Sequence, residues 1–213
     1  MKNKAIIFAG GTISGLNNIN LINDVNINEL YSICVDRGVD FAIENKIKID
    51  IAIGDFDSTS KESIVFLRKH NIETLVFNKD KDMTDMELAL NFCIENDVNE
   101  VYLFGATGTR YDHSISNINL LKTYYEKGLK ISIIDEKNYI FYINKSTIIK
   151  KVDRNISILP TNEKCVFSLY GTKWELKNHH LKFGSSLTIS NEFVNDANIE
   201  ILSGNMFVIL SKD

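Results

Sequence analysis

Proline, cysteine and long apolar runs are all scarce in this chain. Its 213 residues include one proline and three cysteines, Cys34, Cys93 and Cys165. The cysteine count is odd and no Cys-x-x-Cys or Cys/His cluster occurs, so we expect three reduced, mostly buried thiols. No apolar run approaches the roughly 20 residues of a membrane-spanning helix. Residues 5–9 are too short an apolar run for a signal peptide and no cleavage site follows them, so we expect a first strand in a cytoplasmic protein with no membrane partner.

Basic residues are outnumbered by acidic ones. Lys and Arg total 24 against 28 Asp and Glu, which gives a net charge of -4. A nucleic-acid backbone is bound by a basic surface, so no nucleic-acid partner is expected. A small phosphorylated ligand held through metal ions is compatible with this charge. The chain is 44% apolar and 24% charged, which is ordinary for a globular protein, and its length suits one large domain or two small ones.

The first two-thirds of the chain alternates short apolar segments with helical patterns. The sequence predicts strands at 5–9, 30–35, 50–53, 73–77, 101–104 and 130–134, and helices at 61–70, 85–96 and 114–127. In the last helix, one stripe contains Ile115, Ile118, Leu121 and Tyr125. Continuous apolar strands separated by helices favour an α/β fold with a mostly parallel sheet and flanking helices.

After residue 135 the pattern changes to short β-rich segments separated by turn residues. These segments are 139–143, 147–152, 156–159, 165–170, 173–176, 186–189, 199–202 and 206–210. No long amphipathic helix fits this region, which favours a small antiparallel β-sandwich or barrel. We therefore expect an α/β domain at residues 1–138 and a small antiparallel β-sandwich domain at residues 139–213.

Polar residues gather where the predicted strands end, which is where open α/β sheets bind ligands. The strand at 50–53 is followed by Gly54-Asp55-Phe56-Asp57-Ser58. In an extended chain Asp55 and Asp57 face the same way, and two carboxylates held close together favour a cation such as Mg²⁺. The alternative is a turn in which Asp57 or Ser58 caps the next helix.

A second polar group precedes the helix predicted at 85–96. It contains Asp80, Lys81, Asp82, Thr84 and Asp85. Thr84 and Glu87 fit a capping box at the start of that helix. Capping explains Thr84 and one acid, but it leaves Asp80 and Asp82 as members of either a functional site or a solvated charge run.

A third group follows the strand at 101–104. The loop Gly105-Ala106-Thr107-Gly108-Thr109-Arg110 leads into a helix, whose N-terminus offers backbone N–H groups to an anion. Arg110 adds a bidentate phosphate clamp, and the nearby His113 has either a structural or a functional role. The loop matches neither the Walker A pattern nor a strict Gly-x-Gly-x-x-Gly pattern. Together the three groups predict a Mg²⁺–polyphosphate site that transfers phosphoryl groups by positioning and charge neutralisation.

These residues make the chain resemble the thiamine pyrophosphokinase family. The matching first-domain motifs are Val35-Asp36-Arg37-Gly38, Gly54-Asp55-Phe56-Asp57-Ser58, Lys81-Asp82-x-Thr84-Asp85 with Ala89-Leu90, and Gly105-Ala106-Thr107-Gly108-x-Arg110-x-Asp112-His113 with Asn117. The matching second-domain motifs are Gly171-x-Lys173-Trp174-x-Leu176, Phe183-Gly184 and Ser190-Asn191-Glu192. Each motif is weak alone, but together they occur in the family's order across positions 35–192.

The resemblance implies Mg²⁺-dependent transfer of pyrophosphate from ATP to the hydroxyl of thiamine, with release of AMP. It implies an α/β domain that binds ATP and Mg²⁺, a β-sandwich that binds thiamine, and a homodimer whose active sites lie between subunits. The implied metal ligands are Asp55, Asp57, Asp82 and Asp85, and the implied catalytic residues are Lys81, Asp82, Asp85 and Arg110. The implied ATP-binding residues are Asp36, Arg37, Gly38, Gly105, Thr107, Gly108, Arg110, His113 and Asn117. The implied thiamine-binding residues are Asp112, Trp174, Ser190, Asn191 and Glu192.

The chemistry of the second-domain residues agrees with this resemblance. The indole of Trp174 can stack on a cationic ring and attract it, and Ser190, Asn191 and Glu192 can match the hydrogen-bonding groups of an aminopyrimidine. The alternative for Trp174 is a core position of the sandwich. The pair His179-His180 has no acidic or cysteine partner nearby in the sequence and is expected on a surface turn.

Three alternative functions differ from the main one in their requirements. A pyrophosphokinase for another heterocyclic alcohol, such as a hydroxymethylpterin, is disfavoured by Trp174 and by Ser190-Asn191-Glu192. A non-catalytic thiamine or nucleotide sensor is expected to lack a metal carboxylate, and all four are present. An Asp-x-Asp hydrolase usually carries its nucleophile after the first strand, whereas Asp55 follows the third predicted strand.

Overall fold

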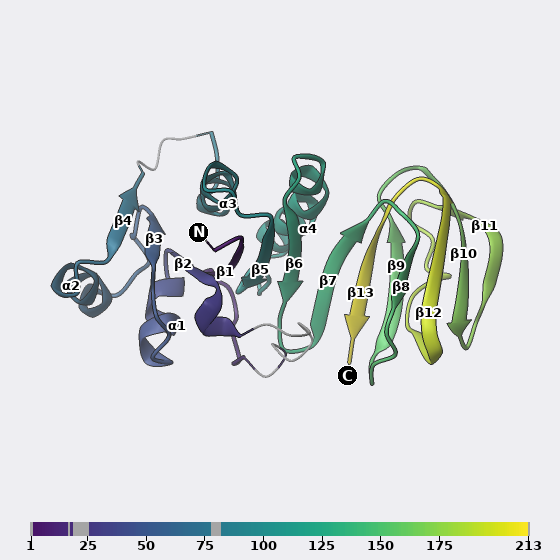
Figure 1. Cartoon of the computed structure of the whole chain (residues 1–213), viewed down its shortest axis with the longest axis horizontal. Helices are drawn as coiled ribbons and strands as arrows, with labels where there is room; N and C mark the ends of the chain where they lie inside the picture. Colours follow the sequence, from purple (N-terminus) through teal and green to yellow (C-terminus); the bar gives the residue numbers. More distant parts are fainter. Residues whose placement is uncertain (1, 17, 19–25, 78–81, 213) are drawn as a thin grey trace. The chain divides into compact units, whose positions relative to one another are not determined.

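The computed structural model describes residues 2–16, 18, 26–77 and 82–212, and the chain divides into two compact units, Met1–Glu136 and Lys137–Asp213 (Figure 1). Within the described ranges, no helix is both long and apolar enough to cross a membrane. Cys34, Cys93 and Cys165 are free and buried, which confirms the prediction made from their spacing.

The sheet of the first unit is parallel. Its strands are β1 (Lys4–Phe8), β2 (Tyr31–Val35), β3 (Ile51–Gly54), β4 (Glu73–Val76), β5 (Glu100–Phe104) and β6 (Lys130–Ile134), in the spatial order β6-β5-β1-β2-β3-β4. Each neighbouring pair in this order is parallel. Strands β1, β2, β3 and β5 are almost entirely buried, as expected for apolar strands covered on both faces. Because the strands are parallel, the loops that follow them meet at one edge of the sheet.

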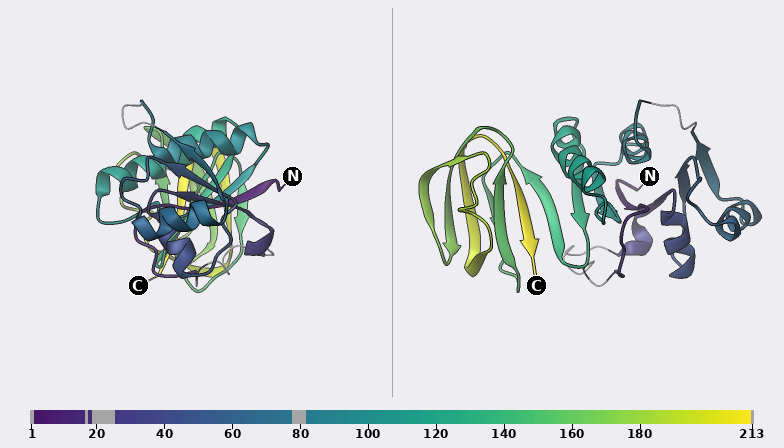
Figure 2. Two further views of the ribbon diagram at one scale, coloured as in Figure 1. Left: turned by 90° about the vertical axis from the view of Figure 1, so that its left-hand side faces the viewer. Right: turned by 180° about the vertical axis from the view of Figure 1, so that it is seen from behind.

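Helices cover both faces of this sheet. The helices α1 (Gly38–Glu44) and α2 (Lys61–Lys69) lie on one face, and α3 (Asp85–Glu95) and α4 (Tyr111–Glu126) lie on the other (Figure 1, Figure 2). A short 3-10 helix, η2 (Ile27–Glu29), precedes β2. The sequence did not predict α1, and α4 begins at Tyr111, before its predicted start at Ser114.

The buried face of α4 also differs from the predicted stripe. Its buried residues are Ser114, Leu120, Leu121 and Tyr124, whereas Ile115 is 60% exposed. The face is rotated from the predicted one toward Leu120 and Tyr124, and Ser114 on this face hydrogen-bonds the preceding loop. A polar residue therefore occupies part of the inward face, which a pattern of apolar residues cannot reveal.

The described strand pairs of the second unit are antiparallel. Its strands are β7 (Asn138–Ile143), β8 (Thr147–Ile149), β9 (Asn155–Pro160), β10 (Lys164–Thr172), β11 (Leu176–Lys182), β12 (Asn191–Ser203) and β13 (Met206–Ser211), in the order β11-β10-β12-β9-β13-β7, with β8 paired to β12. The first residues of β12 pair with β9 and the later ones pair with β10 and β8, so β12 belongs to two layers. Side chains from both layers, such as Ile158 and Phe167, form one apolar core. This arrangement is a small antiparallel sandwich.

The mixed α/β character and the two-part organisation of the chain agree with the sequence prediction. The parallel pairs are confined to the first unit, and antiparallel pairs outnumber them among the described strands of the whole chain. The predicted mostly parallel sheet therefore describes the first unit alone.

Some predicted elements of the second unit are wrong. Residues 173–175 form a bend that leads into β11, and residues 186–189 form turns rather than a strand. The sequence missed most of β11 because this edge strand is largely polar and lacks apolar alternation. His179 and His180 lie in β11, not in a turn, where they pair with Phe167 and Val166 of β10.

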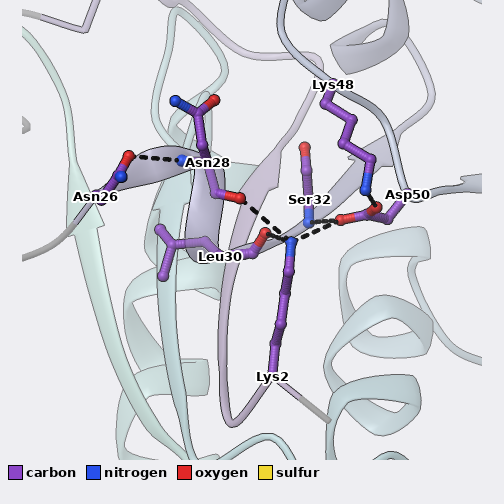
Figure 3. A network of polar contacts seen from close by, with 7 residues as sticks. All are labelled: Lys2, Asn26, Asn28, Leu30, Ser32, Lys48 and Asp50. Atoms are coloured by element: carbon purple, nitrogen blue, oxygen red, sulfur yellow. Dashed lines mark hydrogen bonds and ion pairs between the residues drawn. The ribbon is translucent and has the colours of Figure 1, made fainter.

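A polar network ties together the amino-terminal ends of β1, β2 and β3 (Figure 3). The carboxylate of Asp50 accepts hydrogen bonds from the Ser32 N–H (3.0 Å) and from Nζ of Lys2 (3.4 Å). It also forms an ion pair with Lys48, and Lys2 donates to the carbonyl of Leu30 (2.7 Å). This network stabilises the alignment of the three strands at the end opposite to the loops that would bind a ligand.

Candidate active site

Loops at the carboxyl ends of β1, β2, β3 and β5 line one open cleft of about 1390 Å³. Ligand pockets commonly have volumes of about 300–1,000 Å³, so this cleft has room for a nucleotide. The predicted site residues that line it are Asp36, Arg37, Asp55, Asp85, Gly105, Thr107, Gly108, Arg110, His113 and Asn117. Among the described site residues of the first unit, those outside the lining are Gly38, Asp57, Asp82 and Asp112. Lys81 lies outside the residues that the structure describes.

Backbone hydrogen bonds join the loops that follow β1 and β5. The N–H of Gly11 donates to the Gly105 carbonyl (2.9 Å), and the N–H of Thr12 donates to the Thr107 carbonyl (3.0 Å). A Cβ atom on Gly11 would lie 2.3 Å from the Gly105 oxygen, so only glycine permits this approach. Residues 9–13 line the cleft, whereas the strand end Phe8-Ala9-Gly10-Gly11 is a less typical match to the family and was not included among the predicted site residues. The two glycines after the first strand were the available signal.

Side-chain hydrogen bonds hold the loop after β5 in place. Nδ2 of Asn117 donates to the carbonyl of Ala106 (2.7 Å), and Oγ1 of Thr107 donates to Oδ2 of Asp135 (2.9 Å). Asn117 was predicted to bind ATP, and in this structure its amide also fixes the loop that would hold the phosphates.

Ser114 is a further anchor of this loop, and the sequence analysis missed it. Its Oγ accepts from the N–H of Gly108 (3.2 Å) and donates to the carbonyl of Arg110 (3.0 Å). The side chain lies in the first turn of α4 and lines the cleft. The only sequence signal was a serine on the inward face of the predicted helix.

Arg110 and Asp112 form a two-point ion pair at the start of α4. Nε of Arg110 lies 3.3 Å from Oδ1 of Asp112, and Nη2 lies 2.6 Å from Oδ2. The hydrogen bond from Arg110 lowers the pKa of Asp112 to about 2, and the same bond raises the pKa of Arg110. Both side chains are mostly exposed, so the guanidinium that was predicted to clamp phosphate is held by a weak, solvent-screened contact.

The loop after β3 turns sharply. The N–H of Asp57 donates to Oδ1 of Asp55 (2.9 Å), and Phe56 has a φ of 59°. The extended chain that we assumed for Asp55 and Asp57 is therefore wrong. The capping alternative is also wrong, because the cap of α2 is Ser60, whose side chain accepts from the N–H of Ser63.

Asp85 is the first residue of α3 and lines the cleft, and Asp82 is exposed beside it. The predicted capping box is confirmed, because Oγ1 of Thr84 accepts from the Glu87 N–H (3.2 Å) and the Thr84 N–H donates to Oε2 of Glu87 (3.0 Å). Capping therefore does not need the carboxylate of Asp85.

The donor set of the cleft suits Mg²⁺ rather than a metal held by protein alone. In the part of the chain that the structure describes, no three His, Cys, Asp or Glu side chains gather as a metal site. Mg²⁺ is commonly bound by one or two carboxylates together with substrate phosphates and water. Asp55 and Asp85, which both line the cleft, could provide those carboxylates.

Glycines also shape the cleft wall at β2 and β3. Asp36, which has a φ of 46°, follows β2 and lies over Gly54, where a Cβ atom would lie 2.0 Å from Oδ1 of Asp36. A Cβ atom on Gly38 would lie 1.9 Å from the carbonyl oxygen of Phe8. Gly38 therefore permits α1 to approach β1 closely, and its contact with ATP stays a prediction.

The predicted thiamine-binding residues of the second unit form a separate group around Trp174. The Trp174 N–H donates to Oδ1 of Asn191 (3.1 Å), and Oδ1 also accepts from the N–H of Glu192 (2.9 Å). Nδ2 of Asn191 donates to the Trp174 carbonyl (2.8 Å) and to Oγ1 of Thr172 (3.2 Å). Asn191 is buried and uses its full hydrogen-bonding capacity within the protein. It therefore shapes the bend that carries Trp174, and its contact with thiamine stays a prediction.

In the single chain the side chain of Trp174 is 54% exposed. This exposure excludes the alternative that Trp174 is a core residue of the sandwich. Nζ of Lys173 lies 4.7 Å from the centre of the indole ring. The same ammonium lies 2.8 Å from Oε1 of Glu192. Ser190 precedes this group and its N–H donates to Oγ of Ser157 (2.9 Å).

Family models match both parts of the chain. The thiamin pyrophosphokinase catalytic domain matches residues 22–133, and the thiamin pyrophosphokinase vitamin B1 binding domain matches residues 145–206. The chain belongs to the thiamin pyrophosphokinase family. Each of the two matched regions lies within one of the two compact units.

Individual members of the thiamin pyrophosphokinase family are similar along most of the chain. Thiamine pyrophosphokinase of Bacillus subtilis (strain 168) is 33% identical over 184 residues, which cover 84% of this chain and 86% of that protein. The crystal structure of thiamine pyrophosphokinase from Bacillus subtilis has a TM-score of 0.87 at 30% identity, and 99% of each chain is covered. That of the Geobacillus thermodenitrificans protein has a TM-score of 0.84 at 30% identity, with 99% of this chain and 98% of that chain covered.

Proposed function

We propose that this chain catalyses the Mg²⁺-dependent transfer of pyrophosphate from ATP to the hydroxyl of thiamine, giving thiamine diphosphate and AMP. Membership of the thiamin pyrophosphokinase family supports the reaction. The observation that carries the proposal for the site is the cleft of the first unit, in which the carboxylates of Asp55 and Asp85 and a glycine-containing loop line one space. In this proposal residues 1–138 bind ATP and Mg²⁺ and residues 139–213 bind thiamine.

The phosphates of ATP lie against the loop after β5 and the N-terminus of α4, whose positive dipole end favours anions. Arg110 leaves its exposed pair with Asp112 and binds phosphate oxygens. The nucleotide also contacts Asp36, Arg37, His113 and Asn117, which line the same cleft.

Asp55 and Asp85 hold Mg²⁺, which when bound neutralises the charge of the phosphates. Asp57 and Asp82 are proposed as further members of this acidic set, since each lies close in the sequence to a carboxylate of the lining. The hydroxyl of thiamine attacks the β-phosphorus in line, and AMP leaves. Asp82 or Asp85 accepts the hydroxyl proton, and Arg110 with Lys81 stabilises the charge that develops on the transferred group.

The positively charged ring system of thiamine binds at Trp174 and Glu192 in the second unit. The residues proposed for ATP and for thiamine lie on different units. We therefore propose a homodimer in which each active site combines the cleft of one chain with the Trp174 group of its partner.

The test is AMP formation from ATP and Mg²⁺ in the presence and absence of thiamine. We expect AMP to form only when thiamine is present, and thiamine diphosphate to appear in equal amount. Thiamine-independent hydrolysis of ATP, or AMP formation with a hydroxymethylpterin instead of thiamine, would contradict the proposal. Binding of both ligands without AMP formation would favour the sensor.

A further inference from the structure

The bend between β10 and β11 carries an indole whose face is already covered by a cation. Nζ of Lys173 lies 4.7 Å from the centre of the Trp174 ring, and it also lies 2.8 Å from Oε1 of Glu192. The aromatic face and the carboxylate are the two groups that a positively charged aromatic ligand needs. Both are occupied by a side chain of the protein itself.

The backbone that carries the indole is held in place independently of the Lys173 side chain. Asn191 makes two hydrogen bonds to the backbone of Trp174. In the same bend, Oε1 of Glu175 accepts from the N–H of Gly171 (2.7 Å). The bend is therefore fixed by contacts to its backbone, and the ammonium can leave without disturbing the backbone that carries the ring.

The contacts of the Lys173 side chain are exposed to solvent. The side chains of Lys173 and Glu192 are 50% and 52% exposed, so their ion pair is weakened by water and salt. A cation over an exposed indole face is also bound weakly. A flat cationic ring that covers the same face would exclude water from it. Its interactions with the indole and with the carboxylate would then be stronger than those of a solvated ammonium.

We propose that Lys173 is a place-holding cation, whose ammonium occupies the indole face of Trp174 and the carboxylate of Glu192 until the positively charged ring system of thiamine displaces it. The inference rests on the proposed function, because it takes thiamine as the ligand of this group. In this role Lys173 competes with thiamine and so limits the affinity of the protein for thiamine. It does not contact the reacting atoms.

The first test is the substitution Lys173→Met, which keeps most of the apolar stem and removes the charge. We expect the KM for thiamine to fall about threefold, the size of effect expected when an exposed cation–π contact no longer competes, while the KM for ATP stays the same. Lys173→Arg restores a cation and should return the KM for thiamine toward the wild-type value. Lys177→Met removes an exposed lysine of β11 and is the matched control.

The second test uses fluorescence, because Trp174 is the single tryptophan of the chain. Thiamine should quench this fluorescence, and the dissociation constant from the titration should fall by the same factor in Lys173→Met as the KM does. An unchanged or higher dissociation constant in that variant overturns the inference, since Lys173 would then be neutral toward thiamine or would assist it. The absence of any quenching by thiamine in the wild-type protein overturns it as well.

These readouts separate the inference from the proposed function. Quenching by thiamine without AMP formation would contradict the proposed reaction, yet the shift in the dissociation constant would still decide the role of Lys173. AMP formation with no shift in either constant would uphold the reaction and overturn the role of Lys173.

Discussion

Asp55 offers the sharpest test of the cleft at the scale of a single residue. Its carboxylate lines the cleft while its Oδ1 accepts from the Asp57 N–H. In Asp55→Asn the side-chain oxygen can keep this turn, but the negative charge that suits Mg²⁺ is lost. We expect turnover to fall at least ~100-fold, the scale of losing one electrostatic group of the transition state, with an unchanged melting temperature.

The matched control is Asp97→Asn. Asp97 is exposed and has a φ of 58°, a conformation that Asn also adopts readily. Steady-state rates of AMP formation at several Mg²⁺ concentrations provide the measurement. Wild-type turnover in Asp55→Asn would remove Asp55 from the site.

Trp174 is the corresponding test of the second unit. Truncation in Trp174→Ala should raise the KM for thiamine about tenfold, because a desolvated cation–π contact contributes up to ~2 kcal/mol. The KM for ATP should change little. The side chain is 54% exposed, so thermal denaturation should show nearly wild-type stability. A lower melting temperature with an unchanged KM for thiamine would make Trp174 a structural residue.

The sequence predicted the identity of many cleft residues, because polar groups that follow parallel strands must meet at one edge of the sheet. It did not predict what Asn191 and Ser114 do. Asn191 was expected to bind thiamine, but its hydrogen bonds to the backbone of Trp174 were not foreseen, and Ser114 was not noticed. Such roles depend on hydrogen bonds to backbone groups, and the type of residue at a position does not disclose them.

At the scale of elements, Ser114 connects the first turn of α4 to the loop that it follows. Ser114→Ala removes the bonds to Gly108 and Arg110, each with a net value of about 1 kcal/mol. We expect the KM for ATP to rise about fivefold through a less ordered loop, while the KM for thiamine stays the same. Ser116→Ala, on an exposed position of the same helix, is the control. Equal changes in both KM values would argue against a local effect on the phosphate loop.

The network at the amino-terminal ends of β1 to β3 gives a prediction about pH. Burial of Asp50 opposes its ionisation, but hydrogen bonds from Lys48 and Ser32 and the charge of Lys2 lower its pKa. Because the folded-state pKa is lowered, the stabilisation is complete above the unfolded value of about 3.9 and disappears as the pH falls through the folded value.

Asp50→Asn should therefore lower the melting temperature at pH 7, and the difference from wild type should shrink as the pH falls below about 3.9. Calorimetry across that range is the measurement, with Asp97→Asn as an exposed control. A difference that stays constant down to the lowest pH would exclude the ionised carboxylate as its source.

Element prediction succeeded where the apolar pattern is simple. The continuous apolar strands β1, β2, β3 and β5 were found because they are buried on both faces. Strand β11 was largely missed because its outward positions are polar. The short helix α1 was missed because it has only seven residues, too few for a helical period to stand out.

At the scale of the whole molecule, the proposed homodimer predicts complementation. An Asp85→Asn chain damages only the cleft, and a Trp174→Ala chain damages only the second-unit group. If each site combines both chains, random exchange gives about half heterodimers, each with one intact site, so the mixture should regain roughly a quarter of wild-type activity. Activity is measured with thiamine well below its KM, where Trp174→Ala is weak. Confirmed subunit exchange without recovered activity would show that each chain builds its own site.

The central position of β1 has a consequence for the order in which the molecule is made. Among the described strands β1 comes first along the chain, and one of its two neighbours, β5, follows only after β2, β3 and β4. The backbone hydrogen bond from Gly11 to Gly105 closes the long stretch of chain between β1 and β5. Contacts between residues so distant in sequence form slowly, because closing the loop restricts the conformations of much of the chain. One edge of β1 in a nascent chain therefore stays unpaired until residues 100–104 have been made. The cleft that we propose for the nucleotide is complete only after β5 has joined the sheet.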